Sequence, residues 1–230
     1  MEEHHSFPSL TKGNPIVFFD MDGVLTKEKS SWNYVHKRLG VDNSRNYELF
    51  KMDKINYQEF LRRDVAIWIE KFGEVQVETI KEILNEIEVF NGAKEATEEL
   101  VKENFKLIIV SGGIMWLAER VGMETGIDEI YANSIFSLGG KLIPEGRTMV
   151  DPKRKDVVIR KLISQYNPQF TISVGDSSSD RSMFLCTDFS ISFNYEEVNG
   201  GFTTFDLRTE DMRDCSSLIL SIRDERNEKL

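Results

Sequence analysis

Ile16-Val-Phe-Phe-Asp-Met-Asp-Gly-Val-Leu-Thr26 is the stretch of sequence that decides the fold class. Its apolar residues, Ile16 to Phe19, are followed directly by Asp20, and Asp22 lies two positions further on. A continuous apolar run that ends abruptly at polar residues is typical of a strand buried on both faces of a parallel sheet. Two carboxylates are therefore expected just beyond the carboxyl end of such a strand.

Two later stretches repeat this pattern. Lys106–Val110 runs into Ser111-Gly-Gly113, and Phe170–Val174 runs into Gly175-Asp176. Helical spacing of apolar residues follows both stretches, and alternating strands and helices predict an α/β fold with a doubly wound, Rossmann-like parallel sheet. Because parallel strands end at one edge, where such folds bind ligands, the polar residues that follow them are expected to converge. The converging residues are Asp20, Asp22, Ser111, Asp176 and Asp180.

The segment between Lys27 and Val89 interrupts the alternation of strands and helices. Three apolar stripes with helical spacing follow one another here, on Trp32 to Leu39, Phe60 to Phe72 and Val77 to Ile87, with no strand pattern between them. Helices inserted after the first strand predict a small helical cap over the sheet edge. The predicted organisation is an N-terminal tail over residues 1–15, an α/β core over 16–26 and 90–230, and a cap over 27–89.

The remaining core elements are predicted from turns and short apolar runs. Tyr131–Leu138 and Lys141–Ile143 flank Gly139-Gly140, which predicts a β-hairpin with a two-residue turn. The other expected elements are strands over Asp188–Phe193 and Phe202–Phe205 and helices over Lys153–Gln165 and Glu210–Ser221.

The composition excludes several classes of partner. The 230 residues carry a formal net charge of -10, and a uniformly acidic surface repels nucleic-acid phosphates and anionic membranes. No apolar run approaches the length of a membrane span, and the first residues lack the pattern of a signal peptide. Cys186 and Cys215 are too few for a disulfide framework and are expected to be reduced thiols. We expect a cytoplasmic protein that acts on a small molecule, with an oligomeric state that the sequence leaves open.

The three histidines narrow the chemistry. His4 and His5 lie in the polar N-terminal segment, and His36 is predicted on the solvated outer side of a helix. A Ser-His-Asp triad or a zinc site needs histidine near the strand-end motifs, and the sequence has none there. Carboxylates are therefore expected to carry the proton transfer.

Asp20 and Asp22 suit the hydrolysis of a phosphomonoester. The reaction needs a nucleophile, a proton for the departing oxygen and neutralisation of the phosphoryl oxygens. A carboxylate becomes a competent nucleophile when a divalent cation and several donors cancel its repulsion by phosphate. Asp20 is therefore the predicted nucleophile, which forms an aspartyl-phosphate. Asp22 is the predicted acid, which protonates the leaving group and then activates water.

Asp176 and Asp180 supply further carboxylates after the third strand. Asp176 offers an oxygen ligand of the kind that Mg²⁺ prefers, and Asp180 is expected to bind a metal water or to position a lysine. Each short motif taken alone also fits a plain turn or helix cap. Their joint occurrence, each after a buried strand, favours the catalytic interpretation.

The phosphate group needs hydrogen-bond donors and a balancing positive charge. Ser111 and the N–H groups of Gly112 and Gly113, at a predicted helix start, suit phosphate oxygens. Lys155, at the start of the helix before the third strand, is the first choice for the balancing cation, and Lys153 is the second.

These motifs together resemble those of the haloacid dehalogenase superfamily of aspartate-nucleophile phosphatases. The first motif matches Asp20 to Thr26, the second Ile109 to Gly113, the third Lys155 and the fourth Gly175 to Asp180. The helical cap after the first motif and the Ser-Met-Phe sequence at 182–184 are most similar to the phosphoserine phosphatase group. The likeness covers nearly the whole chain from the first predicted strand onward.

The resemblance implies residue roles and a cofactor. By this likeness Asp20 is the nucleophile, Asp22 is the acid/base, and Mg²⁺ is held by Asp20, the backbone carbonyl of Asp22, and Asp176. An acid at Asp22 separates phosphatases and phosphomutases from the dehalogenases and cation-pumping ATPases of the superfamily. A phosphomutase, and a binding or regulatory module that has lost catalysis, remain alternatives.

The cap departs from the phosphoserine phosphatase pattern. Ile55 to Val65 parallels the cap helix of that group, yet the arginine expected to bind the substrate carboxylate falls at Asp64. The glutamate expected to bind the amino group falls near Lys29, although Glu28 is adjacent. Asp64 is expected either to face the leaving-group pocket or to pair with a basic neighbour on the cap surface, and Arg62 and Arg63 either compensate or are surface charges. The predicted substrate is therefore a small phosphorylated metabolite other than phosphoserine.

Overall fold

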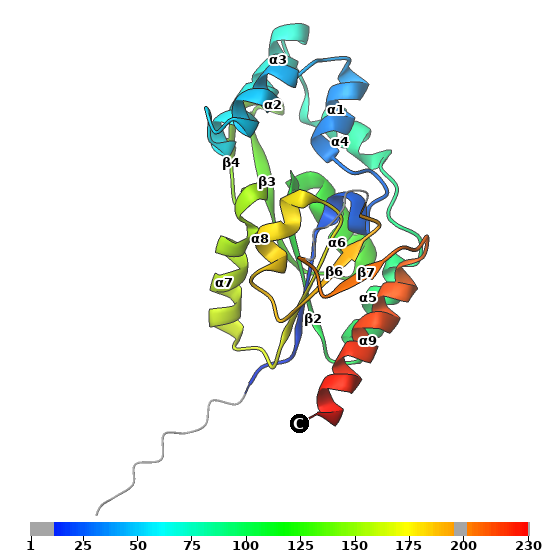
Figure 1. Ribbon diagram of the computed structural model, residues 1–230. Coiled ribbons are helices and arrows are strands. Elements are labelled where there is room, and N and C mark those ends of the chain that lie inside the picture. The colour runs from blue at the N-terminus through cyan, green and yellow to red at the C-terminus, as the bar shows by residue number, and fades with distance from the viewer. Residues whose placement is uncertain (1–11, 196–201, 230) are drawn as a thin grey trace, which may run out of the picture.

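The computed structural model describes residues 12–195 and 202–229 (Figure 1). This part of the chain forms one seven-stranded sheet, with helices on both faces and a further group of helices over one edge. The strand order is β4-β3-β2-β1-β5-β6-β7, and neighbouring strands are parallel except for β3 and β4. The strands are β1 Ile16–Phe19, β2 Lys106–Ile114, β3 Glu129–Leu138, β4 Lys141–Arg147, β5 Thr171–Gly175, β6 Phe189–Phe193 and β7 Phe205–Leu207.

Strand β1 is central and buried on both faces, as its continuous apolar run requires. Ile16 and Phe18 pack into the layer that contains α7 and α8, whereas Val17 and Phe19 pack into the layer that contains α5, α6 and α9. The predicted doubly wound α/β fold is confirmed. The core helices are α5 Ala93–Lys102, α6 Met115–Thr125, α7 Lys155–Tyr166, α8 Arg181–Phe184 and α9 Met212–Glu228.

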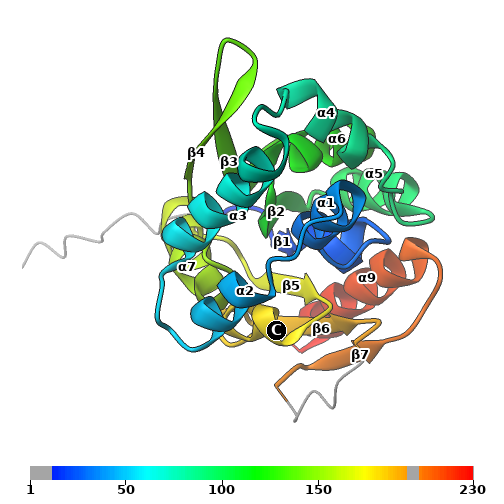
Figure 2. The ribbon, with the colours of Figure 1, turned by 90° about the horizontal axis from the view of Figure 1, so that it is seen from above.

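The cap lies over the carboxyl edge of the sheet (Figure 2). Three of its helices follow the predicted apolar stripes, and Trp68 of the longest helix is fully buried. The fourth helix, α2, was not predicted, because only Asn46 and Phe50 of its residues are buried and its pattern is mostly polar. The cap helices are α1 Ser31–Leu39, α2 Ser44–Lys51, α3 Tyr57–Phe72 and α4 Val77–Asn85.

The chain enters and leaves the cap through two adjacent segments. Thr26 and Val89 form an antiparallel bridge. The N–H of Lys27 donates to the carbonyl of Glu88 at 3.0 Å, and the N–H of Phe90 donates to the carbonyl of Leu25 at 2.8 Å. This two-stranded neck begins directly after the first motif, so the cap rises from the active edge of the sheet.

The predicted hairpin forms between β3 and β4. Gly139 and Gly140 have positive φ angles of 59° and 80°, which a two-residue hairpin turn of this kind requires. Helix α3 packs against β4, and the side-chain amide of Gln58 donates to the carbonyl of Gly146 at 2.8 Å. The hairpin therefore supports the cap from one side.

Two element boundaries differ from the prediction near the C-terminus. The strand expected at Phe202–Phe205 is instead β7, Phe205–Leu207, and the last helix starts at Met212 and continues to Glu228. The extension is polar on its outer side, so an apolar pattern alone does not mark its end. Within the described ranges, none of the helices combines the length and the apolar character that crossing a bilayer demands.

Candidate active site

The carboxyl ends of β1, β2 and β5 bring the predicted motifs together at the floor of one cavity. The cavity has a volume of about 570 Å³ and lies between the core and the cap. The residues of its floor come from segments far apart in the sequence: Asp20, Asp22, Ser111, Gly112, Gly113, Lys155 and Asp176.

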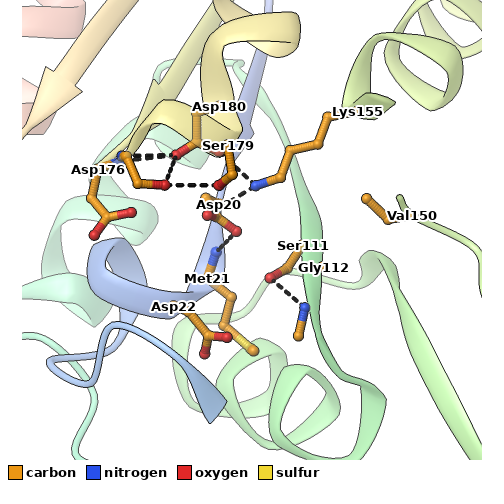
Figure 3. A network of polar contacts seen from close by, with 12 residues as sticks. Asp20, Met21, Asp22, Ser111, Gly112, Val150, Lys155, Asp176, Ser179 and Asp180 are labelled. Carbon is orange, nitrogen blue, oxygen red and sulfur yellow. Dashed lines mark hydrogen bonds and ion pairs between the residues drawn. The ribbon is translucent and has the colours of Figure 1, made fainter. Parts of the chain in front are cut away.

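Asp20 and Lys155 form the charged centre of the floor (Figure 3). The Asp20 Oδ2 atom lies 2.8 Å from Lys155 Nζ, and the Oδ1 atom accepts the N–H of Met21 at 2.7 Å. Lys155 Nζ also lies 2.6 Å from Asp180 Oδ1, and the lysine side chain is almost fully buried. Burial alone lowers the pKa of Lys155, but the carboxylates of Asp180 and Asp20 outweigh it and hold that pKa above its usual range. Lys155 is therefore a permanent cation beside Asp20.

Lys153 occupies a different place. Its Nζ atom donates to the carbonyl of Phe50 at 3.0 Å and pairs with the Asp53 carboxylate at 2.7 Å. The side chain lines the cavity wall but binds the cap, so Lys155 is the lysine that contacts Asp20.

Asp22 lies at the cavity floor in a nearly dry environment. Its Oδ2 atom accepts the N–H of Ser31 at 3.0 Å and the hydroxyl of Ser31 at 2.8 Å. Its Oδ1 atom is buried and has no hydrogen-bond partner among the described residues. Burial is the main cause that raises the pKa of Asp22 to about 7; the Ser31 N–H opposes it and the charge of Asp20 adds to it. A carboxyl group with this pKa exchanges a proton readily near neutral pH.

Gly23 and Gly113 allow these carboxylates to come so close to the backbone. Gly23 has φ of +76°, and a Cβ there would lie 2.1 Å from Asp176 Oδ2. A Cβ on Gly113 would lie 2.8 Å from Asp22 Oδ2. A side chain at either position would displace a carboxylate, because these separations are below van der Waals contact.

Asp20, Asp176 and Asp180 form a compact carboxylate cluster, with one oxygen of each within 4.8 Å of the others. Burial, followed by the charges of Asp20 and Asp180, raises the pKa of Asp176 to about 8. The buried anions outnumber the one buried cation, Lys155, among the described residues of the floor. Hard oxygen donors with unbalanced negative charge fit a divalent cation such as Mg²⁺.

Asp180 organises the loop that carries Asp176. Its Oδ2 atom accepts the N–H of Asp176 at 3.0 Å and the N–H of Ser177 at 3.1 Å, while Oδ1 pairs with Lys155. Gly175 makes this approach possible, since a Cβ there would lie 2.5 Å from the Asp180 carboxyl carbon. Asp180 contacts Lys155, which is consistent with the positioning of a lysine, and the alternative role of binding a metal water stays a prediction.

The floor is also lined by the end of β2, with Ser111, Gly112 and Gly113. The N–H of Gly113 donates to the Ser111 hydroxyl oxygen at 3.1 Å, so it is directed at this side chain. The Ser111 hydroxyl proton is left for an acceptor in the cavity. The carbonyl of Gly112 accepts the hydroxyl of Tyr57 at 2.7 Å, the indole N–H of Trp32 at 3.2 Å and the amide of Asn133 at 2.9 Å.

The cap residues chosen from the sequence lie away from the cavity. Asp64 is fully buried inside the cap and is not among the described residues that line the cavity. Its Oδ2 atom lies 3.0 Å from His36 Nε2 and accepts the Asn43 amide at 3.0 Å, and its Oδ1 atom accepts the Asn46 amide at 3.0 Å. Both expectations for Asp64, a pocket-facing carboxylate and a surface ion pair, are therefore wrong.

His36 and Arg62 also contact other cap residues and do not line the cavity. His36 is buried rather than solvated, and its Nδ1 atom accepts the indole N–H of Trp68 at 2.9 Å. Arg62 forms two hydrogen bonds to Glu59 one helical turn away, at 2.7 and 2.8 Å. Arg62 is not among the described lining residues, so it does not compensate for a missing substrate-binding arginine.

Sequence reasoning missed Ser31, Trp32, Tyr57 and Asn133, each of which contacts the floor. Trp32 was assigned to an apolar helix face and Tyr57 to the cap helix, and their polar atoms gave no separate signal. Ser30 and Ser31, at the start of the first cap helix, are typical of a helix N-terminus, and Ser30 does accept the N–H of Asn33. Nothing in that pattern shows that the second serine binds Asp22.

Comparisons with known proteins agree with this geometry. The family model described as haloacid dehalogenase-like hydrolase matches residues 15–186. A phosphoserine phosphatase of Archaeoglobus fulgidus is 26% identical over 198 residues, which are 84% of this chain but 56% of that protein. A phosphoserine phosphatase of Idiomarina loihiensis is 30% identical over 190 residues, which are 78% of this chain and 81% of that protein.

A solved structure has the same fold. A phospho-aspartyl intermediate analogue of phosphoserine phosphatase superposes with a TM-score of 0.74 at 22% identity, and the match covers 90% of this chain and 99% of that chain. At this level of identity the likeness establishes the architecture alone.

Proposed function

Because this chain belongs to the haloacid dehalogenase-like hydrolases, we propose that it is a Mg²⁺-dependent phosphatase that hydrolyses a small phosphomonoester through an aspartyl-phosphate on Asp20. The observation that carries the proposal is the meeting of Asp20, Lys155 and Asp176, from three distant segments, at the floor of one cavity. A permanent cation beside a candidate nucleophile is an arrangement that suits an anionic substrate.

In the first step, an Asp20 oxygen attacks phosphorus and the bond from phosphorus to the leaving oxygen breaks. Asp22 in its protonated form gives its proton to that oxygen, so the alcohol leaves uncharged. Lys155 offsets the charge of the phosphoryl oxygens, and the Ser111 hydroxyl and the Gly112 N–H donate hydrogen bonds to them. The pKa of Asp22, about 7, supports this role because much of the acid is protonated near neutral pH.

In the second step, Asp22 is a carboxylate and takes a proton from a water molecule, which attacks the phosphorus of the aspartyl-phosphate. The bond to the Asp20 oxygen breaks, phosphate leaves, and Asp22 is protonated again. Ser31 holds Asp22 by two hydrogen bonds, which fixes the carboxyl group between the two steps. Ser31 belongs to cap helix α1, so the cap helps to position the acid.

The carboxylate cluster fits Mg²⁺, and Asp20, the backbone carbonyl of Asp22, and Asp176 are the residues proposed to hold it. The bound cation would supply charge neutralisation at the phosphoryl oxygens and so reduce the repulsion of an anionic nucleophile. Asp180 bonds the loop N–H groups and Lys155, which leaves it a positioning residue in this proposal.

The curated relatives named above are phosphoserine phosphatases, which supports a small phosphorylated metabolite as the substrate. Asp64 does not face the cavity and so gives no reason to reject phosphoserine, whereas Lys29 lines the cavity near the place where a substrate-binding glutamate was expected. The free thiols of Cys186 and Cys215 support a reducing compartment, and we include a cytoplasmic location in the proposal. No observation favours a phosphomutase. Asp20, Lys155 and Asp176 are all present at the floor, which argues against a binding or regulatory module that has lost catalysis.

Phosphate release from para-nitrophenyl phosphate tests the proposal. The purified protein should release phosphate with Mg²⁺, lose this activity in EDTA and regain it when Mg²⁺ is restored. Rapid quenching should yield a peptide that contains Asp20 with the added mass of one phosphoryl group. Turnover without a phosphorylated peptide would contradict the covalent route, and absence of turnover with every ester in a broad panel would contradict the phosphatase assignment.

A further inference from the structure

The cavity continues beyond the reacting groups into a chamber with aromatic walls. Its cap side is formed largely by rings from α1, α2 and α3. Phe50, Tyr57 and Phe60 form one cluster, with ring centroids 5.1 to 5.7 Å apart. The rings are buried within the cap except at their cavity edges, so they offer a preformed apolar surface to the group that is bonded to the phosphate.

Two large apolar side chains at the mouth of this chamber are exposed. Tyr47 of α2 is 51% exposed, and Leu185, directly after α8, is 61% exposed. Both line the cavity, one from the cap and one from the core. When a flat apolar group covers such exposed apolar side chains on both sides of a cavity, the free energy of the complex is lowered.

The charges of the chamber select against an ammonium group. Among the described lining residues the acids are Asp20, Asp22 and Asp176, all of them at the floor where the phosphate binds. The other charged lining residues, Lys29, Lys153 and Arg181, are basic. An ammonium group on the leaving group would therefore meet like charges and would lack a carboxylate partner in the described wall.

A carboxylate on the leaving group would have to displace existing contacts of Lys153 and Arg181. Lys153 is paired with the Asp53 carboxylate at 2.7 Å, and its Nζ atom lies 4.4 Å from the ring centroid of Phe50. The Arg181 guanidinium lies 4.0 Å from the ring centroid of Phe202. A carboxylate would have to compete with these contacts, whereas an uncharged ring needs none of them.

We propose that the leaving group of the substrate is an uncharged alcohol that carries an aromatic ring, held against Tyr47 and Leu185. This inference rests on the proposed phosphatase function and specifies its substrate class. The ring occupies the mouth of the chamber while the phosphate lies on the floor, so the substrate is a short aryl-alkyl or heteroaryl-alkyl phosphate. The chain's own aromatic wall thus replaces the charged contacts that an amino-acid substrate would need.

A panel of four esters with unactivated leaving groups tests the proposal: benzyl phosphate, propyl phosphate, phosphoserine and phosphocholine. We expect kcat/KM for benzyl phosphate to exceed that of each other ester by about tenfold or more, which is the range of a good aromatic contact. Preference for phosphoserine or for phosphocholine would overturn the proposal. Preference for propyl phosphate would overturn it as well, because that ester is uncharged in its leaving group but lacks the ring.

Variants separate a specific contact from a general loss of activity. Tyr47→Ala should lower kcat/KM for benzyl phosphate by roughly fivefold, mainly through KM, and should affect propyl phosphate less. Phe72→Ala is the matched control, because Phe72 is a 49% exposed aromatic residue of the cap that lies outside the cavity lining. It should leave both values unchanged. Equal losses for both esters in Tyr47→Ala would contradict the proposal.

A binding measurement distinguishes failure of this inference from failure of the proposed function. Trp32 lines the cavity, so its fluorescence should report titration with benzylphosphonate and propylphosphonate, which cannot be hydrolysed at the phosphorus–carbon bond. Tighter binding of benzylphosphonate without turnover of any ester would retain the aromatic site and reject the phosphatase. Turnover of esters with equal binding of the two phosphonates would retain the phosphatase and reject the aromatic site.

Discussion

The hydroxyl oxygen of Tyr57 in the cap lies 2.7 Å from the carbonyl oxygen of Gly112 in the second motif of the core. Burial, followed by the charge of Asp64, raises the pKa of Tyr57 far above its usual range, so the hydroxyl remains protonated and donates. Trp32 donates to the same carbonyl from another cap helix. The peptide that presents the Gly112 carbonyl is therefore held from the cap as well as from the core.

Tyr57→Phe should remove this hydrogen bond between cap and core without creating a cavity, because the ring remains in place. The loss of one hydrogen bond to a buried carbonyl is worth about 1 kcal/mol, so kcat/KM should fall about fivefold. Steady-state kinetics with para-nitrophenyl phosphate measures the effect. Unchanged kinetics together with unchanged thermal stability would show that the bond does not couple cap and core.

Asp20→Asn should remove steady-state turnover by on the order of 10⁴-fold or more, because an amide does not attack phosphorus. The fold should survive, since the buried Lys155 keeps its contact with Asp180 at 2.6 Å. Circular dichroism and the melting temperature check the fold. A pure Asp20→Asn protein with substantial turnover would exclude the covalent route.

Asp22→Asn should slow esters with poor leaving groups by about 10²- to 10⁴-fold and aryl esters with good leaving groups much less. With the raised pKa of about 7, the proton-donating form of Asp22 is present below that pH and disappears as pH rises through it. Cleavage of an alkyl phosphate should therefore decline above about pH 7, and the decline should be absent in the variant. Pre-steady-state rates over a pH series measure both effects.

Mg²⁺ affinity should fall as pH falls. The pKa of Asp176 is raised to about 8, so below that pH a proton competes with the cation for the carboxylate. Each unit of pH below this value should weaken binding by up to about tenfold, as calorimetric titration can measure. Asp176→Asn should bind Mg²⁺ weakly with a smaller pH dependence. Ca²⁺ should support less activity, because it prefers a higher coordination number.

Asp64→Ala should destabilise the protein rather than change its substrate. Removing the carboxylate leaves His36, Asn43 and Asn46 without their buried acceptor, which should lower the free energy of unfolding by about 2 to 4 kcal/mol. Glu70→Ala, an exposed position on the same helix, is the control and should change it by less than about 0.5 kcal/mol. Denaturant unfolding measures both. Equal stability of the two variants would refute the role of Asp64 as an anchor.

The sheet was predictable because each of its central strands is marked by a local pattern in the sequence. Each central strand is a continuous apolar run that ends at a polar motif, and parallel pairing then places the ends of β1, β2 and β5 at one edge. The meeting of Asp20, Lys155 and Asp176 follows from this topology. Their assigned chemical roles stay predictions until the variants are measured.

The cap was less predictable because its polar residues bond to one another. A buried carboxylate with three partners looks like any surface acid in a helical pattern, since the partners His36, Asn43 and Asn46 lie 18 to 28 residues away in the sequence. The alignment of Asp64 with a family arginine gave the position of Asp64 on the helix but not the direction of its side chain. That direction depends on how α1 and α2 pack against α3.

The neck between Thr26 and Val89 has a consequence for how this protein could change over generations. Because the chain departs and returns at adjacent points, the intervening stretch of the gene can be replaced, lengthened or recombined while the order of the sheet strands is preserved. Selection for a new nutrient or a new waste product can then act on one contiguous block of codons that holds the aromatic residues of the cavity. The nucleophile Asp20 and its lysine partner lie outside that block and are inherited unchanged, while any replacement must keep a donor for Asp22 such as Ser31.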